Sequence, residues 1–224
     1  MGGQACVFYG AAEFSRDLDL LILTDAGNLD RLRAALEDLE AGPIAVPPLD
    51  PDLLARGHAV HFRCRRPDVA GLRIDVMAVL RGVAGFDELW ARRTTIDAQG
   101  EPVDLLSIED LVQAKKTQRD KDWPMIRRLV EQSYFSTTQE PSPSLVAFWL
   151  RELRTPELLV RVASTYAENA RRLTRPAVSV AMIGDVEATT TALAAEEQDE
   201  RRRDREYWEP LRRELEALRR GRLG

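Results

Sequence analysis

The chain has 224 residues, of which 44% are hydrophobic and 31% are charged, and its formal net charge is −5. This is the composition of an ordinary globular protein, with ample length for a buried core. The negative charge argues against a protein that coats nucleic acid nonspecifically, because such binding needs a broad basic surface. No apolar run is long enough for a membrane span and no signal-peptide pattern is present, so we expect a cytoplasmic protein without a membrane partner.

The first predicted strand carries two carboxylates shortly after a glycine pair. Gly2 and Gly3 precede the segment 15–22, in which Asp17 and Asp19 open an apolar run. Alternate residues of a strand face the same way, so the two carboxylates point together. Two like charges at the mouth of a strand need a positive partner, usually a divalent cation. The pattern predicts a site for Mg²⁺ and phosphate.

A third carboxylate lies in a later predicted strand. Residues 72–80 are mostly apolar, and a lone Asp75 inside such a run must be paired, hydrogen-bonded or bound to metal. Residues 58–64 predict the preceding strand, and His58 and His61 within it have a spacing unsuited to a zinc site. A hairpin of these two strands beside the first strand would bring three carboxylates to one end of a small sheet.

The other segments of the first half predict helices and connections around the sheet. In chain order we expect a helix over 29–39 with Asn28 as its cap, a loop over 42–51, a short helix over 86–93, an extended segment over 103–106, a helix capped by Ser107, and a helix over 125–134.

The second half of the chain predicts only helices. The polar, proline-bearing loop 136–143 divides a catalytic domain over 1–135 from a helical region over 144–224. The predicted helices cover 144–153, 156–173, 178–195 and 196–220. The last has mixed charge and a narrow apolar stripe, which predicts packing on the other helices, on a second copy or on a cognate partner protein.

The order of these motifs resembles the nucleotidyltransferase (polymerase-beta-like) superfamily. Gly-Gly is followed by Ser-x-Asp-x-Asp at the start of an apolar strand and then by a lone Asp in a later strand. The resemblance implies an α+β fold in which a small mixed sheet is flanked by helices and followed by a C-terminal helical region. Family members usually have a helix before the glycine pair, so either the start lies upstream of Met1 or a supporting element is missing. The resemblance implies phosphate contacts for Gly2 and Gly3, a small hydroxyl position at Ser15, and metal ligation by Asp17, Asp19 and Asp75.

Residues 106–122 narrow the resemblance to a branch that includes the AbiEii-type toxins of abortive-infection systems and uncharacterised relatives. That branch has a Lys on a helix and an Asp shortly after a basic residue, which Lys115 and Asp122 match. Asp122 is equally well placed to be the N-cap of the helix that follows.

The resemblance implies transfer of a nucleoside monophosphate from an NTP to an acceptor hydroxyl, with release of pyrophosphate. Two Mg²⁺ ions would bind at the acids, Asp75 would help to deprotonate the acceptor, and Lys115 would neutralise phosphate charge. The acceptor is an RNA end, a protein side chain or a small molecule. Two alternatives remain open at this stage. One is a noncatalytic nucleotidyltransferase-like module that binds a nucleotide or a partner protein, and the other is the toxin member of a toxin and antitoxin pair.

Overall fold

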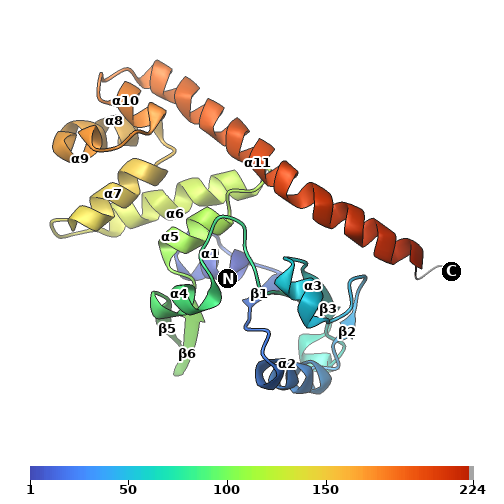
Figure 1. Ribbon diagram of the computed structural model, residues 1–224. Coiled ribbons are helices and arrows are strands. Elements are labelled where there is room, and N and C mark those ends of the chain that lie inside the picture. Colours follow the sequence, from blue (N-terminus) through green and yellow to red (C-terminus); the bar gives the residue numbers. More distant parts are fainter. Residues whose placement is uncertain (222–224) are drawn as a thin grey trace. The chain divides into compact units, whose positions relative to one another are not determined.

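Four short strands form a mixed sheet in the computed structural model, which describes residues 1–221 (Figure 1). The first strand lies at one edge of the sheet and pairs in parallel with its neighbour, and parallel neighbours need a long crossover between them. Two helices, the other two strands and a 3₁₀ turn lie in that crossover. The predicted α+β class is confirmed. The strand order is β1 (Asp17–Leu21), β4 (Arg73–Met77), β3 (Val60–Arg63) and β2 (Gly42–Pro43), and the crossover helices are α2 (Ala26–Asp38) and α3 (Pro51–Ala55).

One face of this sheet forms a hydrophobic core with α2 and α3 (Figure 1). Leu29 and Leu36 from α2 and Leu54 from α3 are buried there against Val60 and Ile74 of the strands. A fully buried leucine or valine contributes roughly 1.5–3 kcal/mol relative to an exposed one. Burial of this face therefore fixes which residues of each strand point the other way.

Several local predictions for the first half need correction. Asp25, not Asn28, caps α2, because its Oδ1 accepts the N–H of Asn28 at 3.0 Å. The expected loop over 42–51 contains the short strand β2 and leads into α3. The expected extended segment over 103–106 is the second strand of a hairpin whose first strand was missed. This hairpin consists of β5 (Thr94–Ala98) and β6 (Glu101–Leu105), and it lies between α4 (Phe86–Ala91) and α5 (Ile108–Ala114).

The second half is helical, as predicted, but the helices expected over 156–173 and 178–195 are each interrupted, and no boundary lies between 195 and 196. The chain breaks at 182–185, where Gly184 has a φ of +83°, and then continues as one helix, α11 (Val186–Gly221). No helix within residues 1–221 is long and apolar enough to cross a membrane. The other helices of this half are α6 (Asp122–Ser136), α7 (Pro143–Glu152), α8 (Pro156–Thr165), α9 (Ala167–Arg171) and α10 (Pro176–Ala181), and the short α1 (Gly2–Phe8) and the 3₁₀ turn η1 (Pro67–Val69) complete the chain.

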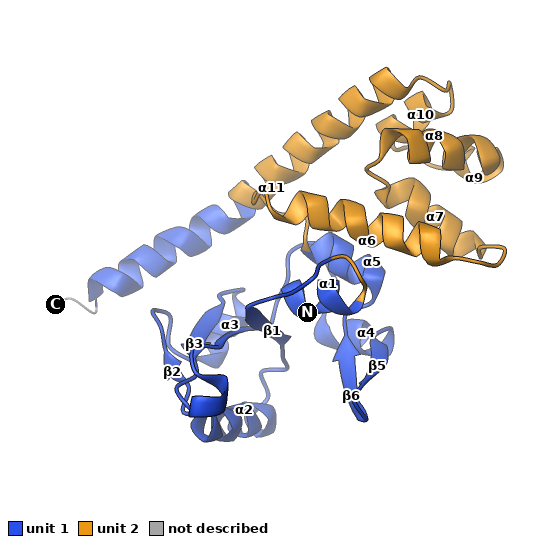
Figure 2. Ribbon diagram, turned by 180° about the vertical axis from the view of Figure 1, so that it is seen from behind, with its two compact units in different colours: residues 1–8, 12–114, 206–224 blue, residues 9–11, 115–205 orange. Residues whose placement is uncertain are grey.

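The chain forms two compact units, whose bounds differ from the division proposed at 136–143 (Figure 2). The first unit contains residues 1–8 and 12–114 together with the chain from Glu206 onward. The second contains residues 9–11 and 115–205. The helix α11 contributes to both units, so its last turns belong to the unit that holds the sheet.

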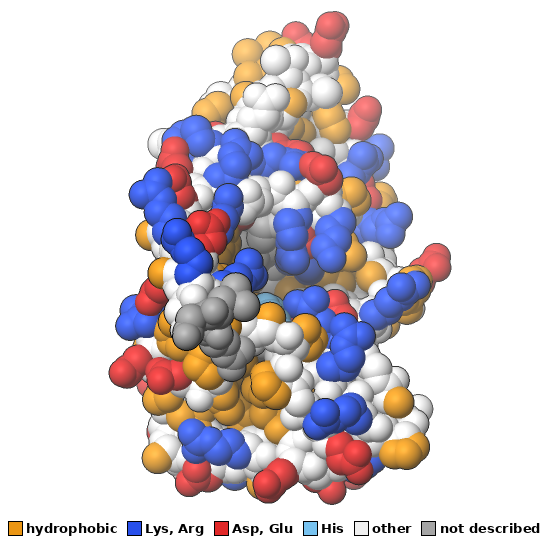
Figure 3. Space-filling model, turned by 90° about the vertical axis from the view of Figure 1, so that its right-hand side faces the viewer, with side chains coloured by type: hydrophobic (Ala, Val, Ile, Leu, Met, Phe, Trp, Pro, Cys, Tyr) orange, Lys and Arg blue, Asp and Glu red, His pale blue; other side chains and the backbone are white. Residues whose placement is uncertain are grey.

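Those last turns of α11 are attached to the first unit by an ion pair and by apolar contacts. Glu214 Oε2 lies 2.7 Å from Nε2 of the fully buried His58, and Glu214 Oε1 lies 2.6 Å from Arg56. Hydrophobic side chains gather beside this end of the helix (Figure 3), where Val46 and Leu218 help to line a hollow. His58 therefore has a structural role in holding the helix.

Candidate active site

The two parallel strands bring the three predicted acids to one face of the sheet. The register of β1 and β4 places Asp19 opposite Asp75 and Asp17 opposite Arg73. Residues that are opposite one another in a ladder point to the same face, and so do residues two apart in one strand. The sheet therefore gathers the three carboxylates and one guanidinium on a common face.

Strand alternation explains this placement. In β4, Ile74 and Val76 are buried in the core, so Arg73 and Asp75 point to the opposite face. The same alternation in β3 directs His61 to the face of the acids, opposite Asp75 in the register. The sequence pattern of buried apolar and intervening polar residues thus builds the polar group.

Asp75 is held by two neighbours on this face. Its Oδ1 accepts a hydrogen bond from Arg73 Nε at 2.7 Å and lies 2.8 Å from His61 Nδ1. Burial acts to raise the pKa of Asp75, but the hydrogen bonds and charges of His61 and Arg73 outweigh it and hold the pKa below its usual range. Asp75 is therefore ionised at neutral pH. A carboxylate with a low pKa can bind a cation but is a weak proton acceptor.

Arg73 supplies positive charge to all three acids. The hydrogen bond to Asp75 is the largest effect on its pKa and raises it, burial opposes this, and the charges of Asp75, Asp17 and Asp19 raise it further. The guanidinium is 38% exposed, which leaves it access to water. Arg73 thus acts as a counterion where a bound cation would otherwise be needed.

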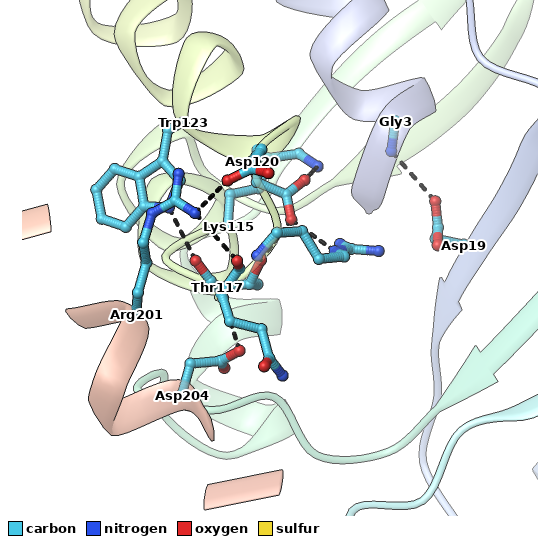
Figure 4. A network of polar contacts seen from close by, with 11 residues as sticks. Gly3, Asp19, Lys115, Thr117, Asp120, Trp123, Arg201 and Asp204 are labelled. Atoms are coloured by element: carbon cyan, nitrogen blue, oxygen red, sulfur yellow. Dashed lines mark hydrogen bonds and ion pairs between the residues drawn. The ribbon is translucent and has the colours of Figure 1, made fainter. Parts of the chain in front are cut away.

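The glycine pair packs directly against the acids. Gly3 N–H donates to Asp19 Oδ2 at 3.1 Å (Figure 4). Gly2 has a φ of +65°, and a Cβ atom on it would lie 1.9 Å from the same oxygen. A Cβ atom on Gly3 would lie 2.4 Å from Ser15 Oγ. Glycine is therefore required at position 2, where the φ is positive, and a side chain at position 3 would require Ser15 to move.

The donor set fits Mg²⁺, although the acids are directed to other partners. Carboxylate oxygens are the protein ligands that Mg²⁺ prefers, and the strand register puts three of them on one face. Within residues 1–221, no three His, Cys, Asp or Glu side chains are arranged so that they could hold a metal ion. Asp75 is directed to Arg73 and His61, and Asp19 to Gly3. Metal binding would require these side chains to exchange their present partners.

Lys115 and Asp122 belong to the second unit and bind each other there. Lys115 Nζ donates to Asp122 Oδ1 at 3.2 Å, and the exposed fractions of these side chains are 8% and 1%. Thr117 Oγ1 and Arg119 Nε donate to Asp122 Oδ2 at 2.6 and 2.8 Å. Burial acts to raise the pKa of Asp122, but the charge of Lys115 and these further donors hold it below its usual range. Asp122 is the first residue of α6, and its carboxylate binds side chains rather than the free N–H groups of the helix.

The surrounding segment is tied to the first half of α11 by further polar contacts. Asp204 Oδ2 accepts the N–H of Gln118 at 2.9 Å, and Arg201 binds Asp120 at 2.5 Å (Figure 4). The guanidinium of Arg201 also lies over the ring of Trp123, 5.6 Å from its centroid. This network holds the 115–123 segment inside the second unit, so the contacts of Lys115 are those of a structural residue.

Sequence reasoning missed Arg73 and gave His61 no role in the acid group. Both lie at alternate positions of predicted strands, on the same face as Asp75. The signal was present in the sequence, because the residue two positions before Asp75 in the same strand must point to the same face as Asp75. Other arginines of the first unit pair with acids outside this group: Arg66 pairs with Asp38 and Asp68, and Arg92 and Arg93 pair with Asp110 and Asp104.

Comparison of this chain with protein-family models, curated proteins and solved structures finds no match in any of the three.

Proposed function

We propose that this chain is a Mg²⁺-dependent nucleotidyltransferase that moves a nucleoside monophosphate from an NTP to an acceptor hydroxyl. The observation that carries the proposal is the register of β1 and β4, which aligns Asp19 with Asp75 and leaves Asp17 on the same face. Three carboxylates with a common direction repel one another, and the single charge of Arg73 compensates only part of their charge. Their arrangement therefore favours metal chemistry over a purely structural role.

Asp17, Asp19 and Asp75 would hold the metal, which when bound would neutralise charge on the triphosphate and activate the acceptor hydroxyl. The low pKa of Asp75 keeps it ionised and ready as a ligand. Arg73 would release it and remain beside the site as a further positive group. We assign Asp75 to ligation rather than to strong proton abstraction for this reason.

The backbone of the glycine pair would approach the phosphates of the nucleotide. Glycine permits that approach because it has no side chain, and its N–H groups bind anionic oxygens. Gly3 N–H already binds an anionic oxygen, that of Asp19. A phosphate oxygen would take the place of this carboxylate when Asp19 turns to the metal, and Ser15 stands next to the same position.

The reaction would exchange one phosphorus–oxygen bond for another. The acceptor oxygen bonds to the α-phosphorus, the bond from that phosphorus to the pyrophosphate oxygen breaks, and the hydroxyl proton passes to solvent. Lys115 stays a candidate for neutralising the phosphates, but its buried pair with Asp122 favours a structural role. The acceptor is an RNA end, a protein or a small molecule.

The experiment measures transfer of label from each of the four α-³²P NTPs to total cellular RNA and to protein in the presence of Mg²⁺. The native chain is compared with an Asp17→Asn, Asp19→Asn double variant and with Asp30→Asn, whose carboxylate is exposed and pairs with Arg33 on the surface. We expect label with the native chain and with Asp30→Asn and none with the double variant. Equal labelling by all three proteins would refute the assignment of the acids.

One observation favours a second candidate, a noncatalytic module of the same kind. Asp75 and Asp19 are bound by protein groups, and no three side chains within residues 1–221 form a ready metal site. A noncatalytic module would bind NTP without transferring label to any acceptor. Binding of an NTP that is insensitive to Mg²⁺, together with no label transfer, would favour this candidate.

A further inference from the structure

A pocket opens beside Asp19 within the first unit. Its volume is about 110 Å³, comparable with the roughly 150 Å³ of an engineered cavity that accommodates benzene. Segments from four parts of this unit line it: Met1; Asp19 and Leu21 of β1; Phe86 and Trp90 of α4; and Asp104 of β6. The pocket thus shares one of the candidate metal ligands and has room for a planar ring system.

The wall formed by α4 is flat and aromatic. The ring of Trp90 is stacked on that of Phe86 with centroids 5.7 Å apart and an interplanar angle of 15°. Arg93 Cζ lies 4.0 Å from the centroid of Trp90. Trp90 is nevertheless 46% exposed, although a tryptophan has a large apolar surface that favours burial. Planar side chains of this kind form stacking platforms for nucleic-acid bases.

The lining of the pocket also includes hydrogen-bonding groups. Ile22 N–H donates to Met77 of β4 at 2.9 Å. Backbone groups of neighbouring strand residues point to opposite sides, so those of Leu21 are directed away from β4. Asp104 accepts hydrogen bonds from Thr95 and Arg93, and these hold its pKa below the usual range. At neutral pH the pocket therefore combines an ionised acceptor with backbone groups of an edge strand.

We propose that this pocket binds the base of the nucleotide whose phosphates are held at the acids. A nucleobase has an apolar face and a polar edge, and the pocket is lined by aromatic side chains and by hydrogen-bonding groups. Because Asp19 belongs both to the pocket and to the acid group, one nucleotide would contact both. This inference rests on the proposed function and adds to it the place of the base.

The experiment separates base binding from phosphate binding. Binding of Mg²⁺ complexes of the four NTPs and of inorganic tripolyphosphate is measured by calorimetry for the native chain, Trp90→Leu and Trp90→Phe. Phe14→Leu is the matched control, because Phe14 is a 67% exposed aromatic residue of the same unit that does not line the pocket. Base stacking on an aromatic side chain predicts that Trp90→Leu weakens NTP binding about 5- to 100-fold. Trp90→Phe and Phe14→Leu should stay within about threefold of the native chain, since the first keeps an aromatic face.

Tripolyphosphate binding distinguishes the ways in which the proposal can fail. We expect it to be the same in the native chain and in Trp90→Leu, because tripolyphosphate has no base. If NTP binding is also the same in both, the pocket does not hold the base, although the proposed function stands. If Trp90→Leu weakens both ligands equally, the effect is not on the base and the inference is wrong. If the native chain binds neither ligand, the proposed function fails and the inference fails with it.

Discussion

Replacement of Arg73 by Gln should strengthen the binding of Mg²⁺ to the free protein. Arg73 donates to Asp75 at 2.7 Å, and its charge also acts on Asp17 and Asp19. A divalent cation among these carboxylates competes with the guanidinium for the same oxygens and is repelled by its charge. Glutamine keeps much of the length and polarity of the side chain but removes the charge.

The size of the effect follows from Coulomb's law. Two unit charges about 4 Å apart interact by about 4 kcal/mol at an effective dielectric constant of about 20. The Arg73 side chain is 38% exposed, so solvent screening reduces this considerably, to about 1–2 kcal/mol. Because about 1.4 kcal/mol corresponds to a tenfold change in affinity, we expect Arg73→Gln to bind Mg²⁺ roughly tenfold more tightly.

Isothermal titration of nucleotide-free protein with MgCl₂ tests this expectation. Arg33→Gln is the matched control, because Arg33 is an exposed arginine of the same unit that pairs with Asp30 rather than with the three acids. Circular dichroism during heating establishes that each variant is folded at the temperature of the titration. Unchanged or weaker Mg²⁺ binding by a folded Arg73→Gln variant would refute the placement of the metal among these acids.

Two further predictions concern stability. Lys115→Met should destabilise the chain by about 3 kcal/mol in urea unfolding at pH 7, because the buried Asp122 carboxylate loses its buried cation and keeps only Thr117 and Arg119 as donors. The pKa of Asp122 in the folded chain is below its ordinary value. Its contribution to stability is therefore present above the ordinary carboxyl pKa and is lost as the pH falls through the folded pKa. The variant should lose less stability than the native chain on acidification. A loss under 1 kcal/mol at pH 7 would contradict this interpretation of the pair. Gly57→Ala should increase hydrogen exchange in residues 206–221, because its Cβ atom would lie 2.8 Å from the hydroxyl of Tyr207. Gly71→Ala is the control, because Gly71 has a similar positive φ but a Cβ atom there would have no atom within 4 Å. Equal exchange in the two glycine variants would show that backbone strain alone matters.

The acid group could be predicted because the direction of its side chains follows from residues that are close in the sequence. Asp17 and Asp19 share a strand, so their common direction follows from the period of two. Asp75 was identified because a charge inside a buried strand needs a partner. The strand patterns on either side of the turn at 66–71 correctly predicted the hairpin of β3 and β4 beside β1.

The remaining features depend on contacts that are distant in the sequence. Whether Asp75 is bound by a metal or by Arg73 and His61 depends on the pairing of three strands. The assignment of the last turns of α11 to the first unit depends on Glu214 reaching His58, a contact over 156 positions. The break before α11 was readable, however, because Gly184 is the residue type that ends helices with a positive φ.

The pairs Arg73–Asp75 and Lys115–Asp122 differ in the free energy needed to separate the cation from the acid. Lys115 and Asp122 are both almost fully buried, so removal of the lysine would leave a carboxylate without access to water. Arg73 is partly exposed and can be hydrated when it leaves Asp75, and an incoming cation would take over its electrostatic role. Exchange of a counterion is therefore far cheaper on the sheet than in the 115–122 segment. A reaction that requires the acids to change partners in each cycle is compatible with Arg73, and this is why we place ligand exchange at the sheet and assign the Lys115 pair to stability.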